Sequence, residues 1–267
     1  MSARAMAERT TILRVTVGST AHGLALVGTD DRDEMGICVE DMHAAMGFSP
    51  FEQYIYRTAA EREGRHDAPS QPGDLDLVIY SLRKFLGLAL RGNPTILIPL
   101  FAREWHIRDA RGQQLQELTP QIVSRQAGRR FLGYMQAQRE RLLGVRGQKR
   151  IRRPELVEQH GYDTKYAMHL LRLGVQGKEL LETGQLTLPM DEASRSQLMA
   201  VRQGRVELSG VIEWAEDLEA RVTALLDTSP LPEHPDTAAV QEWMLGVYLN
   251  AWATTACTKI DAWLKEA

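Results

Sequence analysis

The sequence is poor in cysteine and contains no long apolar run. Cys38 and Cys257 are its only cysteines among 267 residues, which excludes a disulfide framework and a cysteine-rich metal motif. No stretch approaches the roughly 20 consecutive apolar residues that cross a bilayer. The first fifteen residues also lack the basic start and apolar run of a secretory signal. We therefore expect a soluble protein of the reducing cytoplasm, without a membrane partner.

Acidic and basic residues nearly balance, and the formal net charge of −3 gives no sign of a polyanion partner. Their distribution is uneven, however. Residues 125–153 carry ten arginines and lysines against one acid, whereas residues 207–236 carry eight acids against one arginine. The basic segment has two interpretations: it binds phosphates such as those of RNA, or it pairs with the acidic segment of the same chain. The candidate RNA-binding residues are Arg146, Lys149, Arg150, Arg152 and Arg153.

The first part of the chain shows the β-rich runs that are typical of a mixed sheet. Strands are expected at residues 12–17, 35–39 and 75–80. The polar segment 57–73 is interrupted by glycine and proline, which predicts a loop. Ser81 can cap a helix with helically spaced apolar residues, and Gly92-Asn93-Pro94 stops that helix. The apolar run 95–101 fits either a short helix or a buried strand.

Beyond about residue 115, the spacing of apolar residues is helical almost throughout. Long helices are expected near residues 120–143, 163–182, 191–226 and 236–265. The overall prediction is an α+β protein. A small mixed-sheet domain at residues 1–107 would be followed by an all-helical domain at residues 108–267, which is available for substrate binding.

The segment 17–39 holds the residues best suited to chemistry. A predicted strand runs into Gly18-Ser19, where glycine allows a sharp turn and a close approach of phosphate oxygens. A helix that begins there would present free N–H groups to an anion. About a dozen residues later, Asp31 and Asp33 stand two positions apart, so both carboxylates point to the same side of an extended strand. Grouped carboxylate oxygens suit Mg²⁺, which takes its remaining ligands from phosphates and water.

A third carboxylate is expected on the strand at residues 75–80. Asp76 lies between two leucines, and a carboxylate in such an apolar strand usually has a metal or a charged partner. Asp74 is the alternative, although its neighbouring glycine fits the end of a loop. Each acid alone is also typical of a solvated turn. Their order along the chain favours Asp31, Asp33 and Asp76 as metal ligands and catalytic residues.

In this order the motifs resemble the nucleotidyltransferase superfamily of DNA polymerase β, in which Gly-Ser precedes Asp-x-Asp and a single Asp on a neighbouring strand. Three blocks within residues 17–184 narrow the resemblance to the RNA-repair-pathway DNA polymerase β family. They are GSTAHGLA with DDRDEMGI, DLVIYSLRKFLGLALRGNP, and HGYDTKYAMHLLRL with the trailing KELLETG. The run after Asn93-Pro94 lacks an acid that the family often carries, a departure that concerns substrate preference more than the reaction.

The resemblance implies a nucleotidyltransferase that uses Mg²⁺ or Mn²⁺. Gly18 and Ser19 would bind the β- and γ-phosphates of an NTP. Asp31 and Asp33 would bridge two metal ions, and Asp76 would hold the ion that activates an acceptor hydroxyl. The acceptor would attack the α-phosphate in line, and pyrophosphate would leave.

The third block, HGYDTKYAMHLLRL, has two interpretations. Asp163 can cap a helix on which Lys165, His169 and Arg172 are spaced i, i+4 and i+7, so their side chains project from one side. Three such donors suit a triphosphate or an RNA 3′ end, while spacing alone equally describes the polar face of an ordinary amphipathic helix. The weaker candidates are His22 and His160.

Three functions follow from these residues. The leading hypothesis is transfer of an NMP from an NTP to an RNA end. A second keeps the reaction but takes a protein side chain or a small molecule as acceptor. A third is a binding protein that senses a nucleotide or polyanion without catalysis, which the presence of all three candidate carboxylates argues against.

Overall fold

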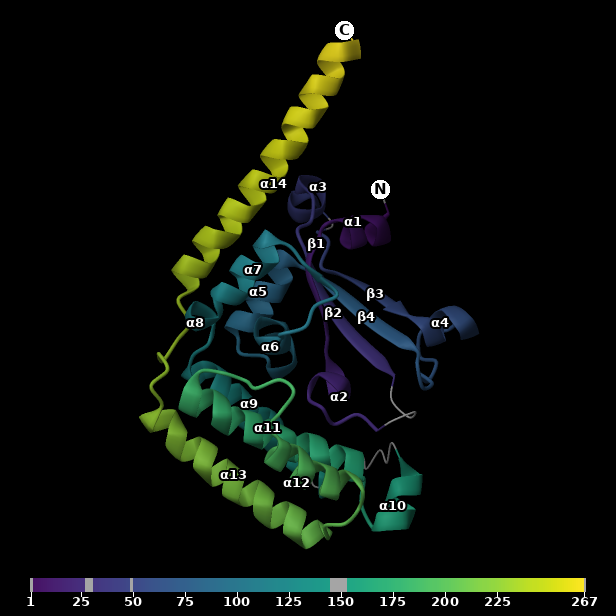
Figure 1. The fold of residues 1–267 in the computed structure, drawn as a ribbon, viewed down its shortest axis with the longest axis vertical. Coiled ribbons are helices and arrows are strands. Elements are labelled where there is room, and N and C mark those ends of the chain that lie inside the picture. The colour runs from purple at the N-terminus through teal and green to yellow at the C-terminus, as the bar shows by residue number, and fades with distance from the viewer. Residues whose placement is uncertain (1, 27–30, 49, 145–152, 267) are drawn as a thin grey trace.

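The computed structural model describes residues 2–26, 31–48, 50–144 and 153–266, with side chains described up to residue 253. Its architecture is α+β, as the sequence predicts. A five-stranded sheet with short flanking helices lies above a bundle of longer helices, and the C-terminal helix runs upward past the sheet (Figure 1).

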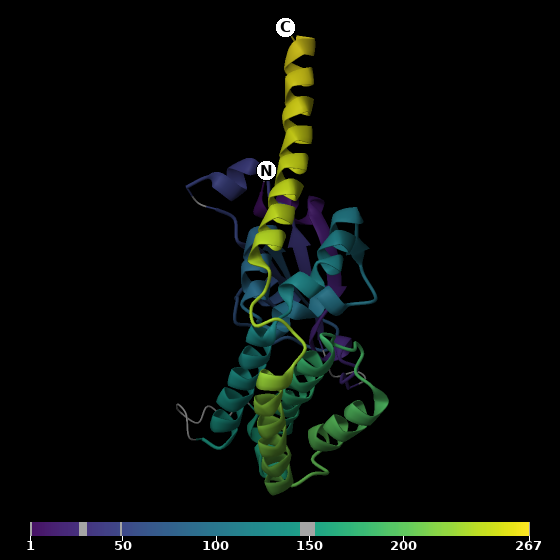
Figure 2. The same ribbon diagram turned by 90° about the vertical axis from the view of Figure 1, so that its left-hand side faces the viewer.

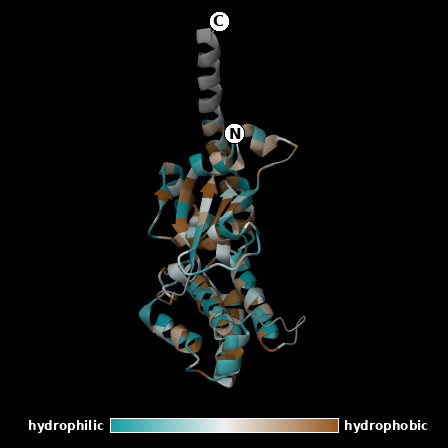
Figure 3. Ribbon diagram, turned by 90° about the vertical axis from the view of Figure 1, so that its right-hand side faces the viewer, coloured by the Kyte–Doolittle hydropathy of each residue, from teal (hydrophilic) through white to brown (hydrophobic). Residues whose placement is uncertain are grey.

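The sheet contains the three predicted strands and two others. Its strands are β1 Thr11–Thr16, β2 Arg32–Cys38, β3 Gln53–Arg57, β4 Leu75–Ser81 and β5 Ile107–Arg108. They follow the order β3-β4-β2-β1-β5, in which β2 and β4 pair in parallel and the other neighbours pair antiparallel. Hydrophobic residues dominate the central strands (Figure 3). Because these residues are buried, β2 and β4 lie side by side in the interior of the sheet.

The prediction that residues 57–73 form a loop is wrong for the first third of that segment. Helix α4 spans Thr58–Glu63, which is rich in good helix formers, and Gly64 ends it with φ 69°. Strand β3, which precedes it, was not predicted. It lies at the edge of the sheet, and its side chains are half-buried or exposed on both faces, so it lacks the alternation that reveals a strand.

The helices of the first part cover the sheet and connect its strands. They are α1 Ala3–Arg9, α2 Gly18–Ala21, α3 Met42–Met46, α5 Leu82–Leu90, α6 Pro94–Phe101, α7 Ala110–Glu117 and α8 Thr119–Ile122. The Ser81 side chain accepts from the N–H of Lys84 and caps α5, as predicted. The undecided run 95–101 is helical, because Asn93 caps α6 and proline occupies its first position.

After residue 110, every regular element that the structure describes is a helix, which confirms the helical second part. The remaining helices are α9 Arg125–Leu142, α10 Pro154–His160, α11 Thr164–Thr183, α12 Glu192–Arg202, α13 Leu208–Thr228 and α14 Thr237–Glu266. Helix α11 packs against both α9 and α13 and buries leucines along its length. None of the described helices is long and apolar enough to cross a membrane.

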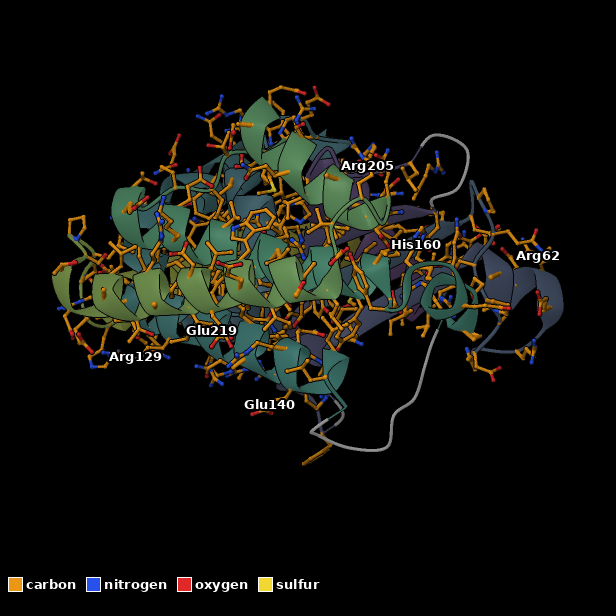
Figure 4. The ribbon with its side chains drawn as sticks, turned by 90° about the horizontal axis from the view of Figure 1, so that it is seen from below. Arg62, Arg129, Glu140, His160, Arg205 and Glu219 are labelled. Carbon is orange, nitrogen blue, oxygen red and sulfur yellow. The ribbon has the colours of Figure 1, made fainter. Side chains whose placement is uncertain are left out.

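The basic and acidic segments lie against each other where α9 packs on α13 (Figure 4). Arg139 is 2.9 Å from both Glu216 and Glu219, and Arg125 and Arg129 both pair with Glu233. Partly exposed ion pairs stabilise a fold by only about 0–1 kcal/mol each. They nevertheless show that much of the basic charge of α9 is matched within the chain, as the second interpretation of that segment predicts.

Helix α14 returns from the helical bundle to the sheet (Figure 2). The Tyr248 hydroxyl donates to the buried carboxylate of Glu40 at 2.8 Å, and the Trp252 indole donates to the Glu40 carbonyl at 3.1 Å. The N–H of Leu82 also donates to this carboxylate, at 3.2 Å. Burial raises the pKa of Glu40. The hydrophobic core is continuous from β1 to α14, and a domain boundary at residue 107 stays a prediction.

Candidate metal and nucleotide site

Three carboxylates meet where the adjacent strands β2 and β4 begin. Asp31, Asp33 and Asp76 each offer an oxygen, and these oxygens all lie within 4.8 Å of one another. Asp33 of β2 and Asp76 of β4 are register partners on adjacent parallel strands, and Asp31 directly precedes β2. The structure therefore brings together the three acids that the sequence selects. All three are half-buried, so their charges repel one another at short range.

The two oxygens of Asp76 have different surroundings. Oδ2 accepts from Arg57 Nε and from the Ser70 hydroxyl, each at 3.1 Å. Oδ1 is buried and has no hydrogen-bond partner among the residues that the structure describes. A buried carboxylate oxygen without a donor is costly. A cation held by this oxygen and the other two acids would satisfy it, so the residues present fit a divalent metal ion.

Asp74 is engaged elsewhere. The Arg62 guanidinium donates to both of its carboxylate oxygens, at 2.7 and 3.0 Å, and the N–H of Gln71 donates to it at 2.8 Å. These hydrogen bonds, with that from Arg62 first, hold the pKa of Asp74 below its ordinary value. Asp74 thus secures the segment that precedes β4. Of the two alternatives for the third acid, Asp76 is the one that joins Asp31 and Asp33.

Gly18 lies directly against the acidic cluster. Its φ is +64°, and a Cβ atom built on it would lie 2.1 Å from Asp33 Oδ2. The N–H of Val17 donates to the Asp33 carbonyl at 2.8 Å and ties the two segments together. Both the left-handed backbone and the close approach require glycine here. The short helix expected at this turn is α2, which has four residues and ends at Ala21.

Helix α11 approaches the same loop from below (Figure 1). The Arg172 guanidinium donates to His169 Nδ1 at 2.9 Å and to Gln176 Oε1 at 2.9 Å, and it also contacts His22 Nε2. Gln176 Nε2 lies 3.2 Å from His22 Nδ1. Of the three residues predicted on this helix, His169 and Arg172 are in direct contact.

Burial and neighbouring charge alter the titration of this group. Burial, followed by the nearby Arg172, lowers the pKa of His169 to about 3 and that of His22 well below its ordinary value. Burial lowers the pKa of Arg172 to about 10, so the guanidinium keeps its charge at neutral pH. His22 is a central member of this cluster, although the sequence makes it a weak candidate. Gln176 and Arg57 are missed entirely, because their partners lie in other elements.

Of the five predicted RNA-binding residues, the structure describes only Arg153. Arg146, Lys149, Arg150 and Arg152 lie outside the described residues. Arg153 donates to Asp163 at 3.2 Å, and Asp163 caps α11 as predicted by accepting from the N–H of Tyr166. His160 packs against Gly204, where a Cβ atom would lie 2.1 Å from its ring. Arg153 and His160 therefore have structural contacts.

Comparison with known proteins gives the chain a family. Its sequence matches the family described as RNA repair pathway DNA polymerase beta over residues 2–245. No curated protein matches it. Among solved structures, a nucleotidyltransferase-like protein from Exiguobacterium sibiricum aligns with 84% of this chain and 71% of its own, at 9% identity and a TM-score of 0.30. Since the family match covers nearly the whole chain, this protein belongs to the RNA repair pathway DNA polymerase beta family, a family of polymerase β-type nucleotidyltransferases.

Proposed function

We propose that this protein is a metal-dependent enzyme that transfers an NMP from an NTP to an acceptor hydroxyl. The observation that carries the proposal is the convergence of Asp31, Asp33 and Asp76 beside Gly18. Family membership supports the reaction class. In the reaction, the acceptor oxygen bonds to the α-phosphorus, the bridging P–O bond to the β-phosphate breaks, and pyrophosphate leaves. The proton of the acceptor passes to solvent.

The acids of the site and Gly18 have different proposed roles. Asp31, Asp33 and Asp76 would hold Mg²⁺ or Mn²⁺, with Oδ1 of Asp76 as the ligand atom because Oδ2 is occupied by Arg57. Bound divalent cations would supply charge stabilisation to the attacking and leaving oxygens. The absence of a side chain at Gly18 leaves room for phosphate oxygens beside Asp33.

The nucleotide phosphates are assigned to groups around the same loop. Gly18 and Ser19 would receive the β- and γ-phosphates. Arg172 brings a positive charge to this loop through its contact with His22, and we propose it as the principal phosphate ligand of α11. Direct binding of phosphate by Lys165 and His169 stays a prediction.

The proposed acceptor is an RNA end, reached in the cytoplasm. The family description supports RNA, and the helical region 108–267 is the proposed substrate-binding domain. The basic segment gives only weak support to RNA binding, because Arg125, Arg129 and Arg139 pair with acids of the same chain. A protein hydroxyl or a small molecule is the second candidate acceptor, and nucleotide sensing without catalysis is the third function to be tested.

Labelled nucleotides test these alternatives directly. The protein is incubated with each NTP, Mg²⁺ or Mn²⁺, and total RNA or protein extract, with the label at either the α- or the γ-phosphate. NMP transfer to RNA predicts that α-label enters the RNA fraction and that γ-label is released as pyrophosphate. Periodate oxidation of the RNA 3′ end should abolish that incorporation. Label in protein would reassign the acceptor. No transfer with any NTP by the wild type, alongside retained nucleotide binding, would favour the sensor function.

A further inference from the structure

Arg172 is a cation surrounded by neutral acceptors. Its described partners are two imidazoles and one amide, from His22, His169 and Gln176. No carboxylate appears among its contacts in the part of the chain that the structure describes. An arginine that is partly withdrawn from solvent normally pairs with an acid, because burying a charge without an opposite charge is costly. Among the described residues no acid matches the positive charge of Arg172, which leaves this charge to interact with a bound anion.

The arrangement also fixes the direction of the guanidinium. Nη1 of Arg172 contacts His22 and Gln176, and Nη2 contacts His169, so the two terminal nitrogens are both held from within the protein. The side chain remains partly exposed. Both histidines are neutral at physiological pH, because burial and the neighbouring Arg172 lower their pKa values. Neutral imidazoles can accept from arginine without cancelling its charge.

His22 connects this cluster to the phosphate loop. It follows α2, three residues after Ser19, and the loop closes around it because the N–H of Leu24 donates to the Ser19 carbonyl at 2.9 Å. The helical region holds the same turn from outside. The N–H of Met190 lies 3.3 Å from the His22 carbonyl, and the Arg195 side chain fills the space that a Cβ at Gly23 would need. His22 is thus fixed in the loop and bonded to α11.

We propose that His22, His169 and Gln176 are positioning residues that hold the Arg172 guanidinium as the counter-charge for the polyphosphate of the nucleotide. The proposal rests on the proposed function and deepens it. It reassigns His169 from a phosphate ligand to a support of Arg172. It also makes the affinity for polyphosphate depend on a contact between the sheet region and the helical region.

The test measures inorganic tripolyphosphate binding by calorimetry in the presence of Mg²⁺. Arg172→Ala should weaken binding roughly 10- to 100-fold, the loss expected for hydrogen bonds to a charged group. Arg172→Lys should recover part of that loss, since it keeps the charge but not the forked geometry. His22→Ala should weaken binding several-fold, and His22→Gln, which restores an acceptor, should recover most of it. Arg221→Ala, at an exposed ion-paired position on α13, is the control and should bind as the wild type does.

A purely structural role would give a different pattern. Each variant is first checked by a thermal melt and by the number of Mn²⁺ ions bound at the acidic cluster, and both should match the wild type. If Arg172→Ala passes these checks and binds tripolyphosphate as tightly as the wild type, Arg172 is not the counter-charge. If His22→Gln binds no better than His22→Ala, His22 does not position it. If the wild type itself binds no Mn²⁺ at the acidic cluster, the proposed function is contradicted. Failure of the proposed function and failure of the proposed role of Arg172 are therefore distinguishable.

Discussion

Asp33 and Asp76 are register partners across the parallel strands β2 and β4, and their carboxylates belong to one cluster with Asp31. Parallel pairing at the centre of the sheet is what places two acids, distant in sequence, on one face at the same level. Arg57 donates to one oxygen of Asp76, and the other oxygen is buried without a hydrogen-bond partner among the described residues.

The two acids of the strand segment 74–76 should behave differently when neutralised. Asp76→Asn removes a cluster carboxylate and should abolish nucleotidyl transfer. Asp74→Asn breaks the pair with Arg62 and should lower the melting temperature while keeping Mn²⁺ binding and transfer. Transfer assays and melts on both variants check this. Activity that survives Asp76→Asn but not Asp74→Asn would show that the third acid is misassigned.

Gly18 should tolerate no side chain. Gly18→Ala places a methyl group 2.1 Å from Asp33 Oδ2 at a φ of +64°, so the loop or the acid must move, at a cost of about 1–2 kcal/mol for the backbone alone. Transfer should be lost. The matched control is Gly133→Ala on α9, where the added Cβ meets nothing within 4 Å. There the helix should gain up to about 1 kcal/mol. Equal effects of the two substitutions in urea denaturation would contradict the predicted close packing.

The link between α14 and the sheet should be measurable as stability. Tyr248→Phe removes the donor to the buried Glu40 carboxylate and the acceptor of the Arg83 N–H. The free energy of unfolding should fall by about 1–3 kcal/mol. Tyr134→Phe changes an exposed tyrosine on α9 and should have little effect. A loss in the control as large as that in Tyr248→Phe would mean that the hydrogen bonds to Glu40 are not the cause.

Acid should destabilise the protein through its buried histidines before most carboxylates titrate. His169 has a folded-state pKa of about 3, below the ordinary 6.5, so the unfolded chain binds its proton first. The stability is fully present above pH 6.5 and is lost as the pH falls from there toward the folded pKa. The slope is about 1.4 kcal/mol per pH unit for each such histidine. His169→Gln should flatten the dependence between pH 6.5 and 5. An unchanged slope in that variant would rule out His169 as its source.

The sequence predicts the acidic site because its determinants are local. Asp31 and Asp33 share a strand face by the two-residue period, and Asp76 stands out as a charge within an apolar strand. The helical second part follows from apolar spacing for the same reason. In contrast, strand β3 lies at an edge where burial does not alternate. Strand β3 forms by pairing with β4, and the sequence of residues 53–57 alone does not reveal that pairing.

Contacts between distant residues account for what the sequence does not predict. Arg172 and His22 are 150 positions apart, and neither has a neighbour in the chain that points to the other. The pairing of Arg139 with Glu216 and Glu219 is of the same kind. Segregated charge along the chain shows that two charged surfaces exist, but only packing of α9 on α13 shows that they face each other.

The central claim is that Asp31, Asp33 and Asp76 form the metal and nucleotide site. Asp31→Asn relieves repulsion within the cluster, so the variant without ligand should be as stable as the wild type or more so. Mg²⁺ and NTP should stabilise the wild type but not Asp31→Asn, by about 2.7 kcal/mol when the ligand is at 100 times its Kd. Asp67→Asn, at an exposed acid outside the cluster, is the control and should respond as the wild type does.

The deciding measurement is a set of thermal melts of these three proteins, each with and without Mg²⁺ and NTP. A ligand-induced shift in the wild type and Asp67→Asn that is absent in Asp31→Asn is the predicted result. An equal shift in all three proteins would place the nucleotide elsewhere and contradict the account.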